Sequence, residues 1–308
     1  MGFSTILQQM GVIAFLVIIG IIAAKRGIVD GVSSKSISTI VVDICNPAMM
    51  LTSVLNGSIT AGHEELTLAG IIAIIFYAIL VLVGFGLPVL LRISHVKRHF
   101  YNMMCVYTNV GFIGIPVARA ILPPDGMLCV LVCNVMYSLL FYTHGVAVLS
   151  GKKQKIQLSQ ILSPGTIAAI LSLIIVWFHI SLPEPVSETI AYVGNATVFL
   201  SMLLLGVSIA RSGLFDGIRN ISIWLFILIR MVTLPILLAY VLNALGIDPV
   251  ITSGMCLMAA MPVGNLPLIQ AEKTGEDTTI LSRAIAVSTA VSMVTITMVM
   301  SVLPSIQG

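Results

Sequence analysis

Two apolar stretches of this sequence are interrupted by residues that break helices. Residues 108–116 read Thr-Asn-Val-Gly-Phe-Ile-Gly-Ile-Pro, and residues 260–267 read Ala-Met-Pro-Val-Gly-Asn-Leu-Pro. Proline removes a backbone N–H and clashes with the preceding turn, and glycine adds backbone freedom. Because hydrocarbon offers no hydrogen-bond partners, a broken helix is tolerated in a membrane only where it is buried in protein or lines a polar cavity. We therefore expect both stretches to lie inside a membrane protein.

The rest of the chain is composed of apolar runs of membrane-spanning length. Hydrophobic residues make up 58% of the sequence and charged residues 9%, whereas a soluble domain carries roughly 25% charged residues. A bilayer requires about 20 apolar residues per helix, which predicts an all-α polytopic membrane protein. The ten predicted transmembrane helices cover residues 5–24, 34–55, 67–91, 99–121, 127–149, 162–180, 187–210, 219–244, 251–272 and 279–303.

The basic residues alternate from one predicted loop to the next. Of the 15 Lys and Arg residues, twelve lie at or near alternate loops: Lys25, Arg26, Lys35, Arg92, Lys97, Arg98, Lys152, Lys153, Lys155, Arg211, Arg219 and Lys273. The other loops carry acidic residues instead. Since cytoplasmic loops accumulate Lys and Arg, we expect the odd-numbered loops in the cytoplasm and both termini on the extracytoplasmic side. The protein should reside in the cell (inner or plasma) membrane.

A constant offset relates the two halves of the chain. Pro116 and Pro267 are 151 residues apart, and shifting the first half by this amount places each of its predicted loops on a loop of the second half. Five spans per half is an odd number, so the second half must be inverted in the membrane. This predicts two inverted repeats, 1–150 and 158–308, with the interrupted spans four and nine in equivalent places. In secondary transporters built this way, paired broken helices mark the substrate site.

The motifs of spans two, four, seven, nine and ten together resemble the auxin efflux carrier family. They are Cys45-Asn46-Pro47-Ala48, residues 109–116, residues 201–206, Met261-Pro262, Asn265-Leu266-Pro267 and Ser288-Thr289. The resemblance implies a five-plus-five inverted-repeat fold in which helices four and nine cross at their prolines, beside a scaffold and a transport domain. It also implies export of auxin or of small organic anions such as malate or malonate, and makes a homodimer plausible. The bile acid/sodium symporters are similar in architecture.

The predicted substrate site lies at this crossing. A half-helix that begins after a break presents unpaired N–H groups and a positive dipole end, which suits a carboxylate. The candidate residues are Asn109, Gly114, Pro116, Pro262, Asn265, Pro267 and Asn46. The alternatives are that the first break is only a structural kink, and that Asn46 makes a hydrogen bond between helices.

Two charged residues lie deep in predicted spans. Counted from the ends of their helices, Asp43 lies ~14 Å and Arg230 ~17 Å into the bilayer, so the two could form a buried pair. Intramembrane charges are rare and usually functional. The pair could be a static strut; otherwise Asp43 could couple transport to protons, or Arg230 could attract the anion.

These observations predict a secondary carrier for a small organic anion, such as a mono- or dicarboxylate or an auxin-like acid. The sequence holds no P-loop, Gly-x-Ser-x-Gly, His-Glu-x-x-His or dinucleotide fingerprint, so we expect no enzyme activity, cofactor, metal site or nucleic-acid partner. A sodium-coupled importer of the bile-acid type is the main alternative; a channel or a membrane sensor is another. One deep carboxylate without a second favours proton coupling or uniport over sodium.

Overall fold

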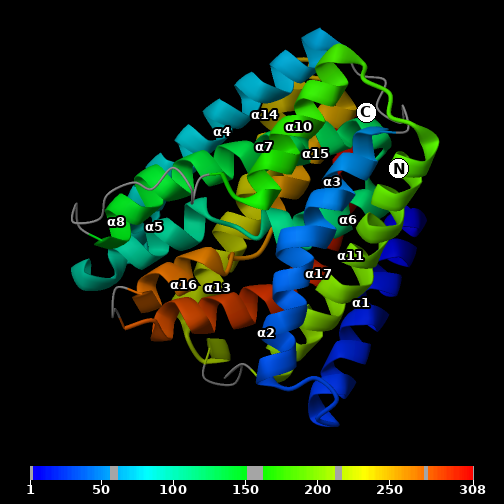
Figure 1. Ribbon diagram of the computed structural model, residues 1–308. Coiled ribbons are helices and arrows are strands. Elements are labelled where there is room, and N and C mark those ends of the chain that lie inside the picture. The colour runs from blue at the N-terminus through cyan, green and yellow to red at the C-terminus, as the bar shows by residue number, and fades with distance from the viewer. Residues whose placement is uncertain (1–2, 56–61, 151–161, 212–216, 274–276, 308) are drawn as a thin grey trace.

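The computed structural model describes residues 3–55, 62–150, 162–211, 217–273 and 277–307, and these are almost entirely helical (Figure 1). The helices of the first half are α1 (Phe3–Lys25), α2 (Gly31–Ile40), α3 (Asn46–Leu55), α4 (His63–Leu90), α5 (Arg98–Val106), α6 (Ile115–Ile121), α7 (Met127–Leu140) and α8 (Val146–Ser150). Those of the second half are α10 (Pro164–Phe178), α11 (Glu184–Arg211), α13 (Ile221–Ile227), α14 (Leu234–Ala244), α15 (Pro249–Ala260), α16 (Leu266–Lys273) and α17 (Thr279–Gln307). Single π-helical turns join α2 to α3, α7 to α8 and α13 to α14 without a break.

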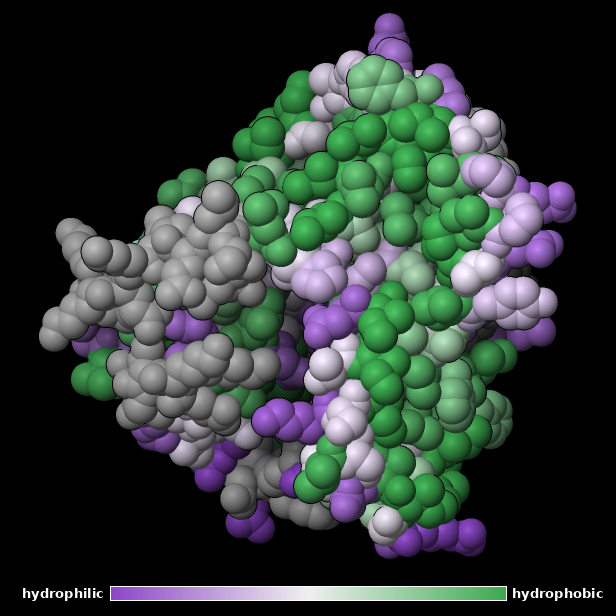
Figure 2. Space-filling view, in the orientation of Figure 1, coloured by the Kyte–Doolittle hydropathy of each residue, from purple (hydrophilic) through white to green (hydrophobic). Residues whose placement is uncertain are grey.

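Within the described ranges, six continuous helices are long and apolar enough to cross a membrane. They cover Gly31–Leu55, His63–Leu90, Pro124–Leu149, Glu184–Arg211, Ile221–Ala244 and Thr279–Gln307. Shorter apolar helices lie in four of the other predicted spans. Large apolar side chains such as Phe15 and Leu82 are exposed on the outside, and Figure 2 shows broad apolar areas on one face. The chain is therefore a multi-pass membrane protein, while ten alternating spans in two inverted halves stay a prediction.

Helix contacts occur in matched sets. Helix α1 packs along α11 in the same way that α10 packs along α3, and α4 packs on α5 as α14 packs on α15. Each of these pairs maps onto the other under the offset of 151 residues. Helices α1, α2, α3 and α11 lie together on the right in Figure 1.

The contact between α1 and α11 depends on two glycines. A Cβ added at Gly20 would overlap the carbonyl oxygen of Leu203, and one added at Gly206 would overlap that of Val17. Small residues let transmembrane helices approach closely, and association is then driven by van der Waals packing. The two helices therefore pack backbone to backbone at this point.

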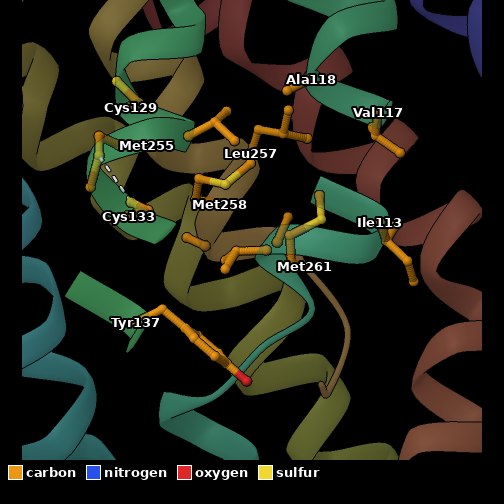
Figure 3. Packing of buried hydrophobic residues seen from close by; sticks show 14 of the residues in the cluster. Ile113, Val117, Ala118, Cys129, Cys133, Tyr137, Met255, Leu257, Met258 and Met261 are labelled. Atoms are coloured by element: carbon orange, nitrogen blue, oxygen red, sulfur yellow. Dashed lines mark hydrogen bonds between the residues drawn. The ribbon is translucent and has the colours of Figure 1, made fainter. Parts of the chain in front are cut away.

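The main core extends through most of the helices, and its part nearest the crossing is formed by α5, α7, α15 and the turns around the breaks. Met255, Met258 and Met261 pack there between Cys129 and Cys133 on one side and Ile113 on the other (Figure 3). Methionine is unbranched and fills irregular gaps between elements. All five cysteines are buried and free of disulfides, in keeping with a packing role.

The interrupted spans are broken, although the first break is shifted from its predicted place. The chain leaves the helix at Tyr107, and a π-helical turn begins at Val110 and leads into α6. Gly111, Gly114 and Pro116 therefore lie in helical backbone after the break. Pro116 follows the π-helical turn, and the carbonyl of Gly111, five residues before it, accepts a hydrogen bond from Asn46 instead.

Candidate functional site: the crossing of two broken helices

The two breaks cross and pair with each other. Thr108 and Val263 form a short antiparallel bridge. The N–H of Asn109 donates to the carbonyl of Pro262 at 2.7 Å, and the N–H of Gly264 donates to the carbonyl of Tyr107 at 2.9 Å. Each unwound segment thus satisfies the backbone groups of the other, as an apolar surrounding requires.

Two further contacts hold the second break in place. The N–H of Val263 donates to the Ser288 hydroxyl at 3.2 Å, which ties the break to α17. A Cβ added at Gly264 would lie 2.9 Å from the Tyr107 oxygen and 3.0 Å from the Thr108 oxygen. The close pairing of the two segments therefore requires glycine at position 264.

Asn109 both ends the first break and caps the helix that follows. Its Oδ1 accepts hydrogen bonds from the N–H groups of Phe112 at 3.1 Å and Ile113 at 3.3 Å. Asparagine is among the preferred N-cap residues for this reason. Because Oδ1 is engaged in the cap, Nδ2 is the group that Asn109 can offer to a ligand.

A cavity of about 190 Å³ lies beside the crossing. It is lined by Ser34 and Ser38 of α2, Leu204, Leu205 and Ser208 of α11, Asn109 and Phe112 after the first break, Asn265 after the second, and Ile285 and Thr289 of α17. Its volume corresponds to about six water molecules, which suits a small solute. All of these residues are uncharged, and their amides and hydroxyls can donate hydrogen bonds.

The structure thus brings the two predicted asparagines, Asn109 and Asn265, into one cavity. The other predicted residues lie around the crossing and do not line the cavity. Gly114 packs near Met258, Pro116 and Pro267 are buried in α6 and α16, and Pro262 is buried at the bridge, where its carbonyl accepts the Asn109 N–H.

Asn46 contacts the first half of the crossing from a neighbouring helix. It is buried at the start of α3, and its Nδ2 donates to the Gly111 carbonyl at 3.4 Å. This contact fits the alternative that Asn46 makes a hydrogen bond between helices.

The serines of α2 and α11 were missed in the sequence. Ser34 and Ser38 are four residues apart and so share one helix face, and Ser208 follows the 201–206 motif by two residues. These spacings were available as a signal, but serine is common on helix surfaces and only the tertiary contact selects these three.

Arg230 is the buried charge of the crossing. It is fully buried in the π-helical turn between α13 and α14. Its Nε donates to the Cys105 carbonyl at 2.7 Å, and its Nη1 donates to the Ala259 carbonyl. These two carbonyls belong to the last turns of α5 and α15, where carbonyls have no intrahelical partner and the helix dipole is negative. One guanidinium therefore caps both broken helices.

The predicted Asp43–Arg230 pair is not formed. Asp43 is exposed in the π-helical turn between α2 and α3, whereas the hydrogen bonds of Arg230 go to main-chain oxygens. The depth estimate placed the two residues at the same level, but level alone does not fix the direction of a side chain. The freed helix ends at the crossing take the place of a carboxylate as the partner of Arg230.

Comparisons with known proteins identify the family of the chain. The family described as "Membrane transport protein", the auxin efflux carrier family, matches residues 5–160 and 153–300. The chain belongs to this family. Its members are transporters, so the chain is a transporter and not an enzyme.

Two archaeal proteins are similar to this chain over nearly their whole length. An uncharacterized transporter of Methanocaldococcus jannaschii is 25% identical over 92% of this chain and 94% of its own length. An uncharacterized transporter of Methanothermobacter thermautotrophicus is 23% identical over 91% of this chain and 93% of its own length.

Proposed function

We propose that the chain is a secondary carrier for a small organic anion, a mono- or dicarboxylate or an auxin-like acid, which binds in the crossing cavity. The observation that carries this proposal is that Asn109 and Asn265, one from each break, line the same small cavity of neutral donors. A helical run begins directly after each asparagine. Two positive dipole ends therefore adjoin the cavity, which favours an anion.

The carboxylate accepts hydrogen bonds from the asparagine Nδ2 groups and from serine hydroxyls. Each bond to a charged group contributes roughly 1.5–3 kcal/mol. The absence of a charged residue from the lining described above lets the anion leave as readily as it enters, since no salt bridge has to be broken.

Two groups of helices line the cavity, and this arrangement supports transport by alternating access. Ser34, Ser38 and Ser208 come from helices α2 and α11, while both asparagines and Thr289 come from the crossing and α17. Movement of one group of helices past the other would open the cavity first to one side and then to the other. The matched helix contacts support inverted repeats, 1–150 and 158–308, as the basis of this movement.

The hydrogen bonds of Arg230 to the ends of the broken helices favour proton coupling or uniport over sodium coupling. The carbonyl ends of broken helices are the groups that bind sodium in related architectures. Here the guanidinium already neutralises the carbonyls of Cys105 and Ala259. A sodium-coupled importer remains the competing proposal, and outward transport rests on the family resemblance.

A homodimer accounts for the exposure of Asp43. This carboxylate lies in a membrane-spanning helix between Val42 and Ile44, which are exposed as well. A second copy of the chain packed on this face would cover Asp43 together with the two apolar side chains beside it.

Proteoliposome counterflow with labelled malate, malonate and indole-3-acetate tests the proposal. We expect exchange of at least one of these anions without sodium, with or without dependence on a pH gradient. Exchange that requires sodium would favour the importer, conductance far above carrier rates would indicate a channel, and no exchange of any carboxylate would contradict the proposed function.

A further inference from the structure

A second cavity, larger than the one at the crossing, lies in another part of the molecule. It has a volume of about 580 Å³ and is formed between the end of α4, the turn before α5, the start of α5, and α8. Its lining residues are Gly84, Phe85, Pro88, Val89, His95, Val96, Arg98, His99, Val148 and Leu149. None of these residues lines the crossing cavity.

This cavity separates apolar from basic side chains. Its α4 wall runs from Gly84 to Val89, roughly 8 Å along the helix, and is apolar. Arg98 stands at the first turn of α5, which has no side-chain N-cap, and the imidazoles of His95 and His99 lie beside it. Nε of Arg98 donates to the Ile93 carbonyl at 3.1 Å, which fixes the guanidinium at this end of the cavity.

The apolar wall continues onto the surface that faces the membrane. Phe85 is 55% exposed and Val89 is 52% exposed, and Leu82 and Leu90 next to them on α4 are exposed as well. A water-soluble anion gains nothing from an apolar wall, whereas the acyl chain of a lipid can pack against it. The loop at residues 92–98 belongs to the basic loops that the charge pattern places at the cytoplasmic surface.

We propose that this cavity binds an anionic phospholipid, with its phosphate at Arg98 and the adjoining histidines and its acyl chain along Phe85, Val89 and Val148. Basic pockets between membrane helices on the cytoplasmic side bind anionic head groups. The volume lies within the range of about 300–1,000 Å³ that is typical of ligand pockets, and is about three times that of the crossing cavity. The site therefore differs from the carrier site in both size and chemistry.

The binding experiment uses the delipidated full-length protein in detergent, with native mass spectrometry and thermal stability as readouts. Dioleoylphosphatidylglycerol, dioleoylphosphatidylcholine and free glycerol phosphate are added in separate arms. We expect phosphatidylglycerol alone to bind at one molecule per chain and to raise the melting temperature. Equal binding of phosphatidylcholine would overturn the role of charge, and equal binding of glycerol phosphate would show a site for a free anion instead of a lipid.

Variants place the lipid in the cavity. Arg98→Gln should weaken phosphatidylglycerol binding about fivefold, the contribution of one basic residue near an anionic surface. Arg92→Gln is the matched control, because Arg92 is exposed in the same connection between α4 and α5 and does not line the cavity. An equal loss in both variants, or no loss in Arg98→Gln, contradicts the proposal.

A second variant keeps the experiment decisive if Arg98→Gln does not fold. Val148→Trp fills the cavity without changing the charge, and it should weaken phosphatidylglycerol binding to a similar extent. Undiminished lipid binding by this variant overturns the assignment.

Discussion

The crossing of the broken helices and the contact between α1 and α11 both bring two backbones close together, but they do so in different ways. At the α1–α11 contact the helices are intact, so only the absence of side chains at Gly20 and Gly206 is required. At the crossing the helices are unwound, and hydrogen bonds and the Arg230 cap join the backbones in addition to the close approach at Gly264. The α1–α11 contact therefore only has to stabilise the fold, whereas the crossing also leaves polar groups next to a cavity.

The largest loss of stability is expected when Arg230, the buried charge at the crossing, is replaced. Arg230→Leu leaves the buried carbonyls of Cys105 and Ala259 without this partner, and each buried polar group left unpaired costs about 1–3 kcal/mol. Arg230→Lys keeps the charge but not the two-pronged geometry, so it should restore part of the stability. Thermal unfolding followed by fluorescence-detected size exclusion measures both variants.

Arg26→Leu is the control for that series, because Arg26 is exposed at the end of α1. It should unfold as the wild type does. Equal stability of Arg230→Leu and the wild type would show that the double cap does not matter.

The next largest loss of stability is expected at the contact between the intact helices α1 and α11. Gly206→Ala places a Cβ against the Val17 carbonyl and forces α1 and α11 apart. Overpacking of this kind costs about 1–3 kcal/mol. The melting temperature should fall, while anion exchange per folded molecule is retained at low temperature. A selective loss of exchange would mean that this contact takes part in transport.

Gly264→Ala tests whether the pairing of the two breaks matters for transport more than for stability. Its Cβ would lie 2.9 Å from the Tyr107 oxygen, so the bridge between the breaks must open. We expect counterflow to fall tenfold or more, with a smaller drop in melting temperature than for Gly206→Ala. Gly86→Ala in α4 is the control, since a Cβ there meets no other atom within 4 Å, and should leave both readouts unchanged.

The smallest effect is expected at Asn46. Its Oδ1 is buried without a hydrogen-bond partner among the described residues, and its one bond to Gly111 is long, at 3.4 Å. The substitution removes the unpaired Oδ1 and costs the Gly111 carbonyl only this weak bond, so Asn46→Leu should fold and transport normally. Loss of counterflow in a stable Asn46→Leu would assign Asn46 to substrate binding.

The sequence predicted the helical segments and the meeting of the two breaks, because glycine, proline and apolar length act locally. It misplaced the first break, because the capping side chain of Asn109, more than the proline at 116, determines where the helix restarts. It also missed the partners of Arg230, since main-chain carbonyls leave no residue signature. The serines of α2 and α11 could not be selected, because only tertiary packing brings them to the cavity.

This correction changes the expected effect of two substitutions. Pro116→Ala cannot close a break that ends at Asn109, so it should be nearly neutral for counterflow. Asn109→Ala removes a helix cap, which costs about 1 kcal/mol, so it disturbs folding together with binding and is a poor test of the site.

Asn109→Asp provides the cleaner test of the central claim that the crossing binds an anion through Asn109. Aspartate is as good an N-cap as asparagine, so the helix start is kept, but the Nδ2 donor is replaced by a carboxylate oxygen. Asn220→Asp is the matched control, since Asn220 caps α13 through its Oδ1 in the same way and does not line the cavity.

The decisive measurement is the counterflow of labelled malate, malonate and indole-3-acetate by these two variants at matched melting temperature. The account predicts that Asn109→Asp loses at least tenfold in exchange of the transported anion, while Asn220→Asp exchanges it as the wild type does. Normal exchange by a well-folded Asn109→Asp would contradict the account, because the crossing would then be a structural kink and the anion would bind elsewhere.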